Sequence, residues 1–149
     1  NVIDPAPTAE ETISEPSKYE VMRTNSIAKK NCAIQTKLEK VISYTKQTMV
    51  AYMSEEDLNR LCTYVAEYSS GDTLQKISPV KVDSQLKSID IMHFGWNIGK
   101  AFSKKRIHTA TFIKNVFAHT LRDLEISTIE RKMSHTESVC CIKLDVKIV

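Results

Sequence analysis

Glycine and proline are scarce in this sequence, which has three glycines and four prolines among its 149 residues. Folds made only of β-strands need many tight turns, so this shortage argues against such a fold and favours helices. Long apolar runs are also missing, because none approaches the roughly 18 residues that a membrane-spanning helix requires. The N-terminus lacks the basic and apolar regions of a signal peptide. We therefore expect a soluble, cytoplasmic, mainly α-helical protein with no membrane partner.

Paired cysteines are missing as well. The four cysteines show no CxxC spacing, and the neighbours Cys140 and Cys141 cannot easily form a disulfide with each other. We expect free thiols in a reducing compartment. Cys32 and Cys62 lie in helical patterns, where a buried thiol acts as a small hydrophobic side chain. The histidines of the last third show no close pairing with each other or with cysteine, so no metal site is predicted.

Catalytic motifs are absent from the sequence. It contains no GxSxG element, no glycine-rich phosphate loop and no pair of carboxylates placed for acid–base work. The run from Gly95 to Lys100 lacks the ending of a phosphate loop and lies in a helical pattern. We therefore predict a protein that is not an enzyme, with no catalytic residue, no cofactor and no small-molecule substrate.

The charges are unevenly distributed along the chain. Residues 1–20 contain five acidic residues against one lysine, a net charge of −4, and three of the four prolines. Such a segment cannot offset its ordering entropy, so residues 1–18 are expected to form a disordered acidic tail. Residues 19–149 are expected to form a single helical domain. Residues 100–135 contain eight basic and three acidic residues, a net charge of +5, so an anionic partner would bind there.

Apolar residues at three- and four-residue steps predict about five helices. A long helix from about residue 20 to 53 comes first, and a second, capped by Ser54, ends at Gly71. A third, capped by Asp83 or Ser84, runs to about residue 102, and a fourth is capped by Thr109. A capping box formed by Ser127 and Glu130 opens the fifth, which continues to about residue 134. The connector at residues 72–82 could include a short strand.

Two glycines, Gly95 and Gly99, lie one turn apart in the third helix. Glycine is unfavourable inside a helix, so this pair indicates close approach of another backbone more than it indicates a ligand site. Trp96, Phe112 and Phe117 are the aromatic residues that we expect in the core.

The C-terminal half has the element order of a helix-turn-helix followed by a wing. Residues 107–136 would form the two helices, and residues 139–149 alternate apolar and polar side chains, which predicts a terminal strand. In a helix-turn-helix the second helix enters the major groove, so it should expose polar and basic side chains. The candidate nucleic-acid contacts are Lys104, Lys105, Arg106, Thr128, Arg131, Lys132 and His135. Alternatively, these residues form only a solvated face of two helices that close the domain.

A helix that carries Phe112 and Phe117 is followed by Ile129-Glu130-Arg131-Lys132 and by Thr136. This succession resembles the C-terminal part of the RteC-type regulators of conjugative elements. In that family a further helical Phe-Leu-Asp segment follows, whereas this chain has Val139-Cys140-Cys141-Ile142 in strand rhythm. The resemblance implies a regulator on a mobile element, with Arg131 and Lys132 as DNA contacts.

Two hypotheses follow from the sequence. The first is a DNA-binding accessory or regulatory protein that uses its helix-turn-helix-like basic region. The second is a helical adaptor that binds another protein or a second copy of itself. The long N-terminal helix could extend a coiled coil, and the terminal strand could pair with another chain, so a homodimer fits both hypotheses.

Overall fold

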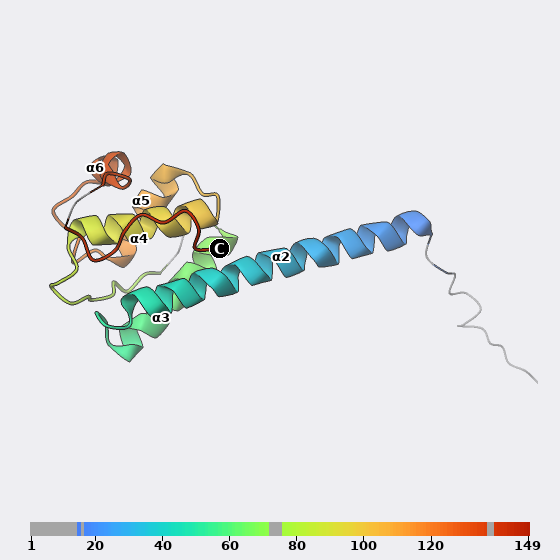
Figure 1. Ribbon diagram of the computed structural model, residues 1–149, viewed down its shortest axis with the longest axis horizontal. Helices are drawn as coiled ribbons and strands as arrows, with labels where there is room; N and C mark the ends of the chain where they lie inside the picture. Colours follow the sequence, from blue (N-terminus) through green and yellow to red (C-terminus); the bar gives the residue numbers. More distant parts are fainter. Residues whose placement is uncertain (1–14, 16, 72–75, 137–138) are drawn as a thin grey trace, which may run out of the picture. The chain divides into compact units, whose positions relative to one another are not determined.

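A computed structural model describes residues 15, 17–71, 76–136 and 139–149. These residues form five helices and no strand, which confirms the mainly α-helical class (Figure 1). The helices are α2 (Lys18–Met49), α3 (Glu55–Ser70), α4 (Ser88–Ala101), α5 (Arg106–Val116) and α6 (Ile126–Lys132). By its internal contacts the chain divides into two units, residues 1–35 and residues 36–149, which we describe separately.

The described part of the first unit consists mainly of the beginning of α2. Most of the predicted acidic tail, residues 1–14 and 16, lies outside the described residues, and Lys18 is already helical. A capping box that the sequence interpretation missed opens α2: the Ser17 hydroxyl accepts from the Glu20 backbone N–H (3.1 Å), and Glu20 Oε2 accepts from the Ser17 N–H (3.4 Å). Every residue from 18 to 35 is exposed, including Cys32, so the expectation of a buried thiol at Cys32 is wrong.

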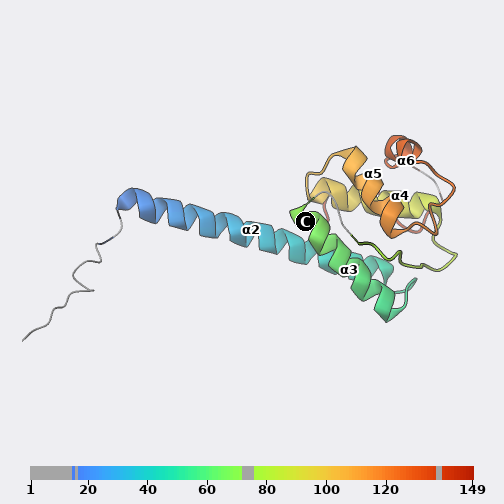
Figure 2. The same ribbon diagram turned by 180° about the vertical axis from the view of Figure 1, so that it is seen from behind.

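The second unit has its core around α4. The C-terminal segment passes over one side of α4 and α5 lies on the opposite side, as the two opposed views show (Figure 1, Figure 2). Aromatic rings connect the helices: Tyr68 of α3 stacks on Phe112 of α5 at 4.2 Å, and Phe94 of α4 meets Phe117 edge-on at 6.0 Å. Phe112 and Phe117 are therefore core residues as expected, whereas Trp96 is only half-buried.

Of the four predicted caps, the Ser54 cap of α3 is confirmed. The Ser54 hydroxyl accepts from the Asp57 N–H at 3.1 Å, and Gly71 ends the helix. The other three predictions are wrong. Helix α4 starts after Lys87, and α6 starts after Glu125 without a side-chain cap. Thr109 is buried inside α5, where its hydroxyl lies 2.7 Å from the Tyr68 hydroxyl, so a tertiary partner takes the oxygen that was expected to cap the helix.

The two glycines of α4 face α5 at very short range. A Cβ atom added to Gly95 would lie 2.7 Å from Ile113 Cγ2, and one added to Gly99 would lie 2.5 Å from Thr109 Oγ1. Real Cβ atoms do not come this close to other heavy atoms. The pair serves packing, as predicted, but side chains of α5 approach the glycines instead of another backbone.

The predicted terminal strand is wrong. Residues 139–149 are irregular, and the described part of the 72–82 connector forms no strand for them to pair with. Side chains of α4 bind the backbone of the C-terminal segment: Asp90 Oδ1 accepts from the N–H groups of Cys141 (2.6 Å) and Ile142 (3.0 Å). Ile142 is buried in the core although its segment forms no strand. The expected wing and the strand-mediated dimer were both inferred from that strand, so neither is supported.

Candidate nucleic-acid interface

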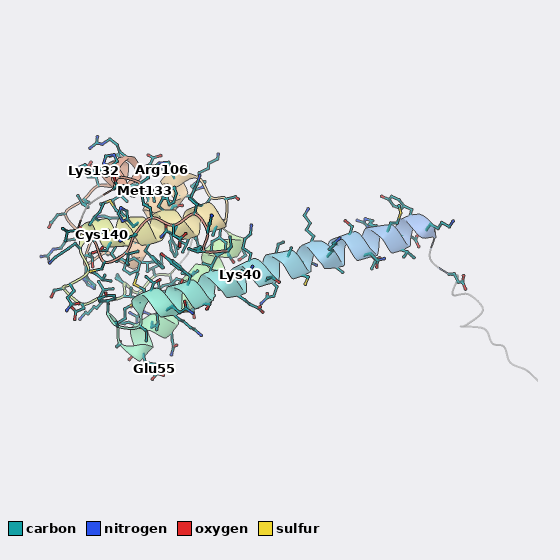
Figure 3. The ribbon with its side chains drawn as sticks, in the orientation of Figure 1. Lys40, Glu55, Arg106, Lys132, Met133 and Cys140 are labelled. Carbon is teal, nitrogen blue, oxygen red and sulfur yellow. The ribbon has the colours of Figure 1, made fainter. Side chains whose placement is uncertain are left out.

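Arg106, the first residue of α5, connects the two basic segments that the sequence interpretation selected. Its guanidinium donates hydrogen bonds to the Ser134 hydroxyl (3.1 Å) and to the Glu130 backbone carbonyl. The beginning of α5 therefore lies against the end of α6, and Arg106 and Lys132 gather at one end of the unit (Figure 3). A small hollow beside Arg106 is lined by Trp96, Lys100, Lys104 and Met133 among others. We call Lys100, Lys104, Lys105, Arg106, Arg131 and Lys132 the basic corner.

The predicted contact residues differ in how available they are. Lys105, Arg131, Lys132 and His135 are exposed, and Thr128 is half-buried. Within the described parts of the chain, no salt bridge includes Lys105, Arg131 or Lys132.

Lys104 and Arg106 already have structural partners. Lys104 Nζ donates to the Gly71 carbonyl (3.2 Å) and lies 5.2 Å from the centre of the Tyr68 ring. This lysine connects α5 to the end of α3, and Arg106 connects α5 to α6. Their replacement would therefore change the fold as well as the charge.

The helix dipoles of α5 and α6 act differently on the basic residues of the corner. Arg131 and Lys132 occupy the last turn of α6, where the helix dipole favours positive charge. Lys105 is the N-cap of α5 and Arg106 is its first residue, and the first turn has no acidic residue, although positive charge there costs roughly 0.3 to 1 kcal/mol. The hydrogen bonds of Arg106 to α6 offset part of this cost. The lysines add to the positive potential of the α5 N-terminus, and together they attract anions.

Lys100 and Trp96 belong to the same surface, and the sequence interpretation did not include either of them. Lys100 Nζ lies 5.6 Å from the centre of the Trp96 ring. Their i, i+4 spacing on α4 was the available signal, but Trp96 was assigned to the core because of its size.

A second feature without a sequence prediction is an open cleft of about 480 Å³ between the end of α2 and the C-terminal segment. Tyr44, Thr48 and Tyr52 line one side, and residues 141–145 line the other. Burial raises the pKa of Tyr44, whose hydroxyl accepts a hydrogen bond from Asn97 Nδ2 at 2.7 Å. The Cys141 thiol raises the pKa of Tyr52.

Acidic, histidine and cysteine side chains do not cluster in the described residues: no group of three of them could hold a metal ion. The four cysteines are free thiols, as expected, and burial raises the pKa of the half-buried Cys62. Among the described helices, none is both long and apolar enough to span a membrane.

Comparisons with protein-family models, with curated proteins and with solved structures found no significant match to this chain. The site must therefore be interpreted from its own geometry.

Proposed function

We propose that the chain is a non-enzymatic DNA-binding accessory or regulatory protein, and that the basic corner contacts the DNA. The observation that carries the proposal is the position of Arg106. Its hydrogen bonds bring the basic start of α5 to the basic end of α6. In the sequence these two segments are separated by the rest of α5 and by the turn that precedes α6. A convergence of cations from several elements is what binding to a phosphate backbone requires.

The corner residues take different roles in this proposal. Lys105 and Lys132 contact phosphates, which supplies affinity without sequence preference. Arg131 projects from α6, the helix proposed to enter the major groove, and its guanidinium can donate two hydrogen bonds to guanine. Lys104 and Arg106 bond to neighbouring helices and add to the positive electrostatic potential of the basic corner.

The test is fluorescence anisotropy of a labelled random duplex at several salt concentrations. We expect Lys105→Ala/Arg131→Ala/Lys132→Ala to weaken binding and to lower the slope of log K against log salt by about 2, because the two phosphate contacts of Lys105 and Lys132 are lost. A matched control, Lys40→Ala/Lys46→Ala/Lys81→Ala, removes three exposed charges outside the corner. Equal losses in both triple variants would indicate a diffuse charge effect, and the absence of binding by the native chain at low salt would refute the proposal.

One observation favours the second candidate, a protein-interaction module. Several large apolar side chains in residues 18–35 are exposed: Tyr19 (68%), Met22 (65%), Ile27 (46%) and Ile34 (59%). Ile27 and Ile34 are seven residues apart, which is the spacing of one coiled-coil position. Sedimentation analysis of the native chain tests whether this helix associates with a second copy, which gives a concentration-dependent dimer. Because a homodimer fits both candidates, a dimer separates them only when the anisotropy titration detects no DNA binding.

A further inference from the structure

Three polar side chains of α4 bind the backbone of the C-terminal segment. Asp90, His93 and Asn97 follow one another at i, i+3 and i+7, and each is only 1% exposed. Asn97 Nδ2 donates to the Lys143 carbonyl (2.9 Å), and Asn97 Oδ1 accepts from the Asp145 N–H (2.6 Å). Asp90 accepts the N–H groups of two residues of the segment, as described above. Side chains thus provide the bonds that a neighbouring strand would provide in a sheet.

His93 contacts two carbonyl oxygens at once. Its Nδ1 lies 2.7 Å from the Ile142 carbonyl oxygen, and its Nε2 lies 2.6 Å from the His135 carbonyl oxygen. A carbonyl oxygen can only accept a hydrogen bond, whereas a neutral imidazole has one N–H and one lone pair. Only the imidazolium, which carries a proton on each nitrogen, donates to both oxygens.

The polar group before His93 on α4 binds the same segment. Asp90, one turn earlier on the same helix, accepts three backbone N–H groups: Cys141 and Ile142 on Oδ1 and Lys87 on Oδ2 (2.9 Å). The elements packed against α4 carry other titratable side chains: Tyr44 and Tyr52 at the end of α2, Arg106, His108 and Lys114 on α5, His135 after α6, and Cys140, Cys141, Lys143, Asp145 and Lys147 on the C-terminal segment.

We propose that His93 is a proton-dependent latch that holds the C-terminal segment and the end of α6 on α4. Loss of one ring proton to water leaves a lone pair facing a carbonyl oxygen at hydrogen-bond distance. That contact becomes repulsive. The hold of α4 on the C-terminal segment then weakens as pH rises, while the Asp90 and Asn97 bonds to the segment remain. This latch does not depend on whether the basic corner binds DNA.

The test uses the native chain and nuclear magnetic resonance. At mildly acidic pH we expect the ¹⁵N signals of His93 to show protons on both ring nitrogens. On raising the pH to mildly alkaline, we expect the hydrogen-exchange protection of the Cys141 and Ile142 amides to fall about ten- to hundredfold beyond the intrinsic change in exchange rate, since a charge-assisted hydrogen bond is lost. Amides inside α3 should keep their protection. A His93 ring with one unprotonated nitrogen, observed while both amides remain protected, would overturn the proposal.

Two variants sharpen the test. In His93→Gln the side-chain amide cannot reach both carbonyl oxygens, so the two amides should be poorly protected at every pH and should lose the pH dependence. His119→Gln removes an exposed histidine and should retain the native dependence. If His119→Gln abolished the dependence, His93 would not be its source. If His93→Gln does not fold, the titration of the native chain still decides.

Discussion

Helix α4 and the first half of α2 are stabilised in opposite ways. In α4, ten of 14 residues are buried, and three of these are the polar side chains Asp90, His93 and Asn97. In α2, every residue from 18 to 35 is exposed, although several are large and apolar. Helix α4 depends on its tertiary partners, whereas the first half of α2 depends on a capping box and on a run without glycine or proline. Large apolar side chains in a helix therefore do not by themselves show that the helix is buried.

The largest expected effect is in the core around α4. Phe117 is completely buried and meets Phe94 edge-on. Phe117→Ala should lower the free energy of unfolding by about 3 to 5 kcal/mol, because it removes a buried ring and leaves a cavity. Denaturant unfolding monitored by circular dichroism measures this loss. A loss below about 1 kcal/mol would show that the aromatic cluster does not support α4.

An intermediate effect is expected where α4 meets α5. Gly→Ala inside a helix normally stabilises by about 0.5 to 1 kcal/mol, but a Cβ at Gly95 would collide with Ile113 Cγ2, so Gly95→Ala should destabilise by about 1 to 3 kcal/mol. Adding Ile113→Ala should make the combined loss smaller than the sum of the two single losses, which a double-mutant cycle detects. Gly71→Ala, where the nearest atom would be 4.0 Å away, is the control and should be nearly neutral. Stabilisation by Gly95→Ala would contradict the close approach.

The smallest effect is expected in the exposed part of α2. Ile27→Ala and Ile34→Ala should each change the stability of the monomer by no more than about 0.5 kcal/mol, because neither side chain is buried. The same substitution at the buried Ile98 of α4 should cost about 2 to 5 kcal/mol. If sedimentation detects a dimer of the native chain, the variant carrying both α2 substitutions should dissociate it. A large loss of monomer stability would show that these side chains have a partner within the chain.

Prediction from local spacing succeeded at one helix start and failed at two, since the Ser17–Glu20 capping box was missed and the predicted Ser127–Glu130 box does not form. Ser54 caps α3 through Asp57, three residues away, and needs no distant residue. The glycine pair of α4 was interpreted correctly because the cost of glycine in a helix requires compensation by packing. In contrast, the oxygen of Thr109 was assigned to a cap, but Tyr68, 41 residues earlier, takes it.

The candidate interface was predictable only in part, for the same reason. The sequence indicates the exposed cations Lys105, Arg131 and Lys132 through the local excess of positive charge. It does not indicate that Arg106 bonds to the end of α6 or that Lys104 bonds to Gly71, since these partners are 24 or more residues away. Charge content is a local property, whereas the choice of bonding partner is a tertiary one.

The sequence by itself determined the helical class, the cap of α3 and the basic character of the C-terminal half. These depend on spacing, on the scarcity of glycine and proline, and on composition. Only the tertiary structure decided that residues 139–149 form no strand, that His93 lies between two carbonyl oxygens, and that two basic segments share one corner. The physical reason is that a backbone N–H or C=O group bonds to whichever group the fold brings within reach. Near Ile142 that group is a side chain of α4 instead of another strand.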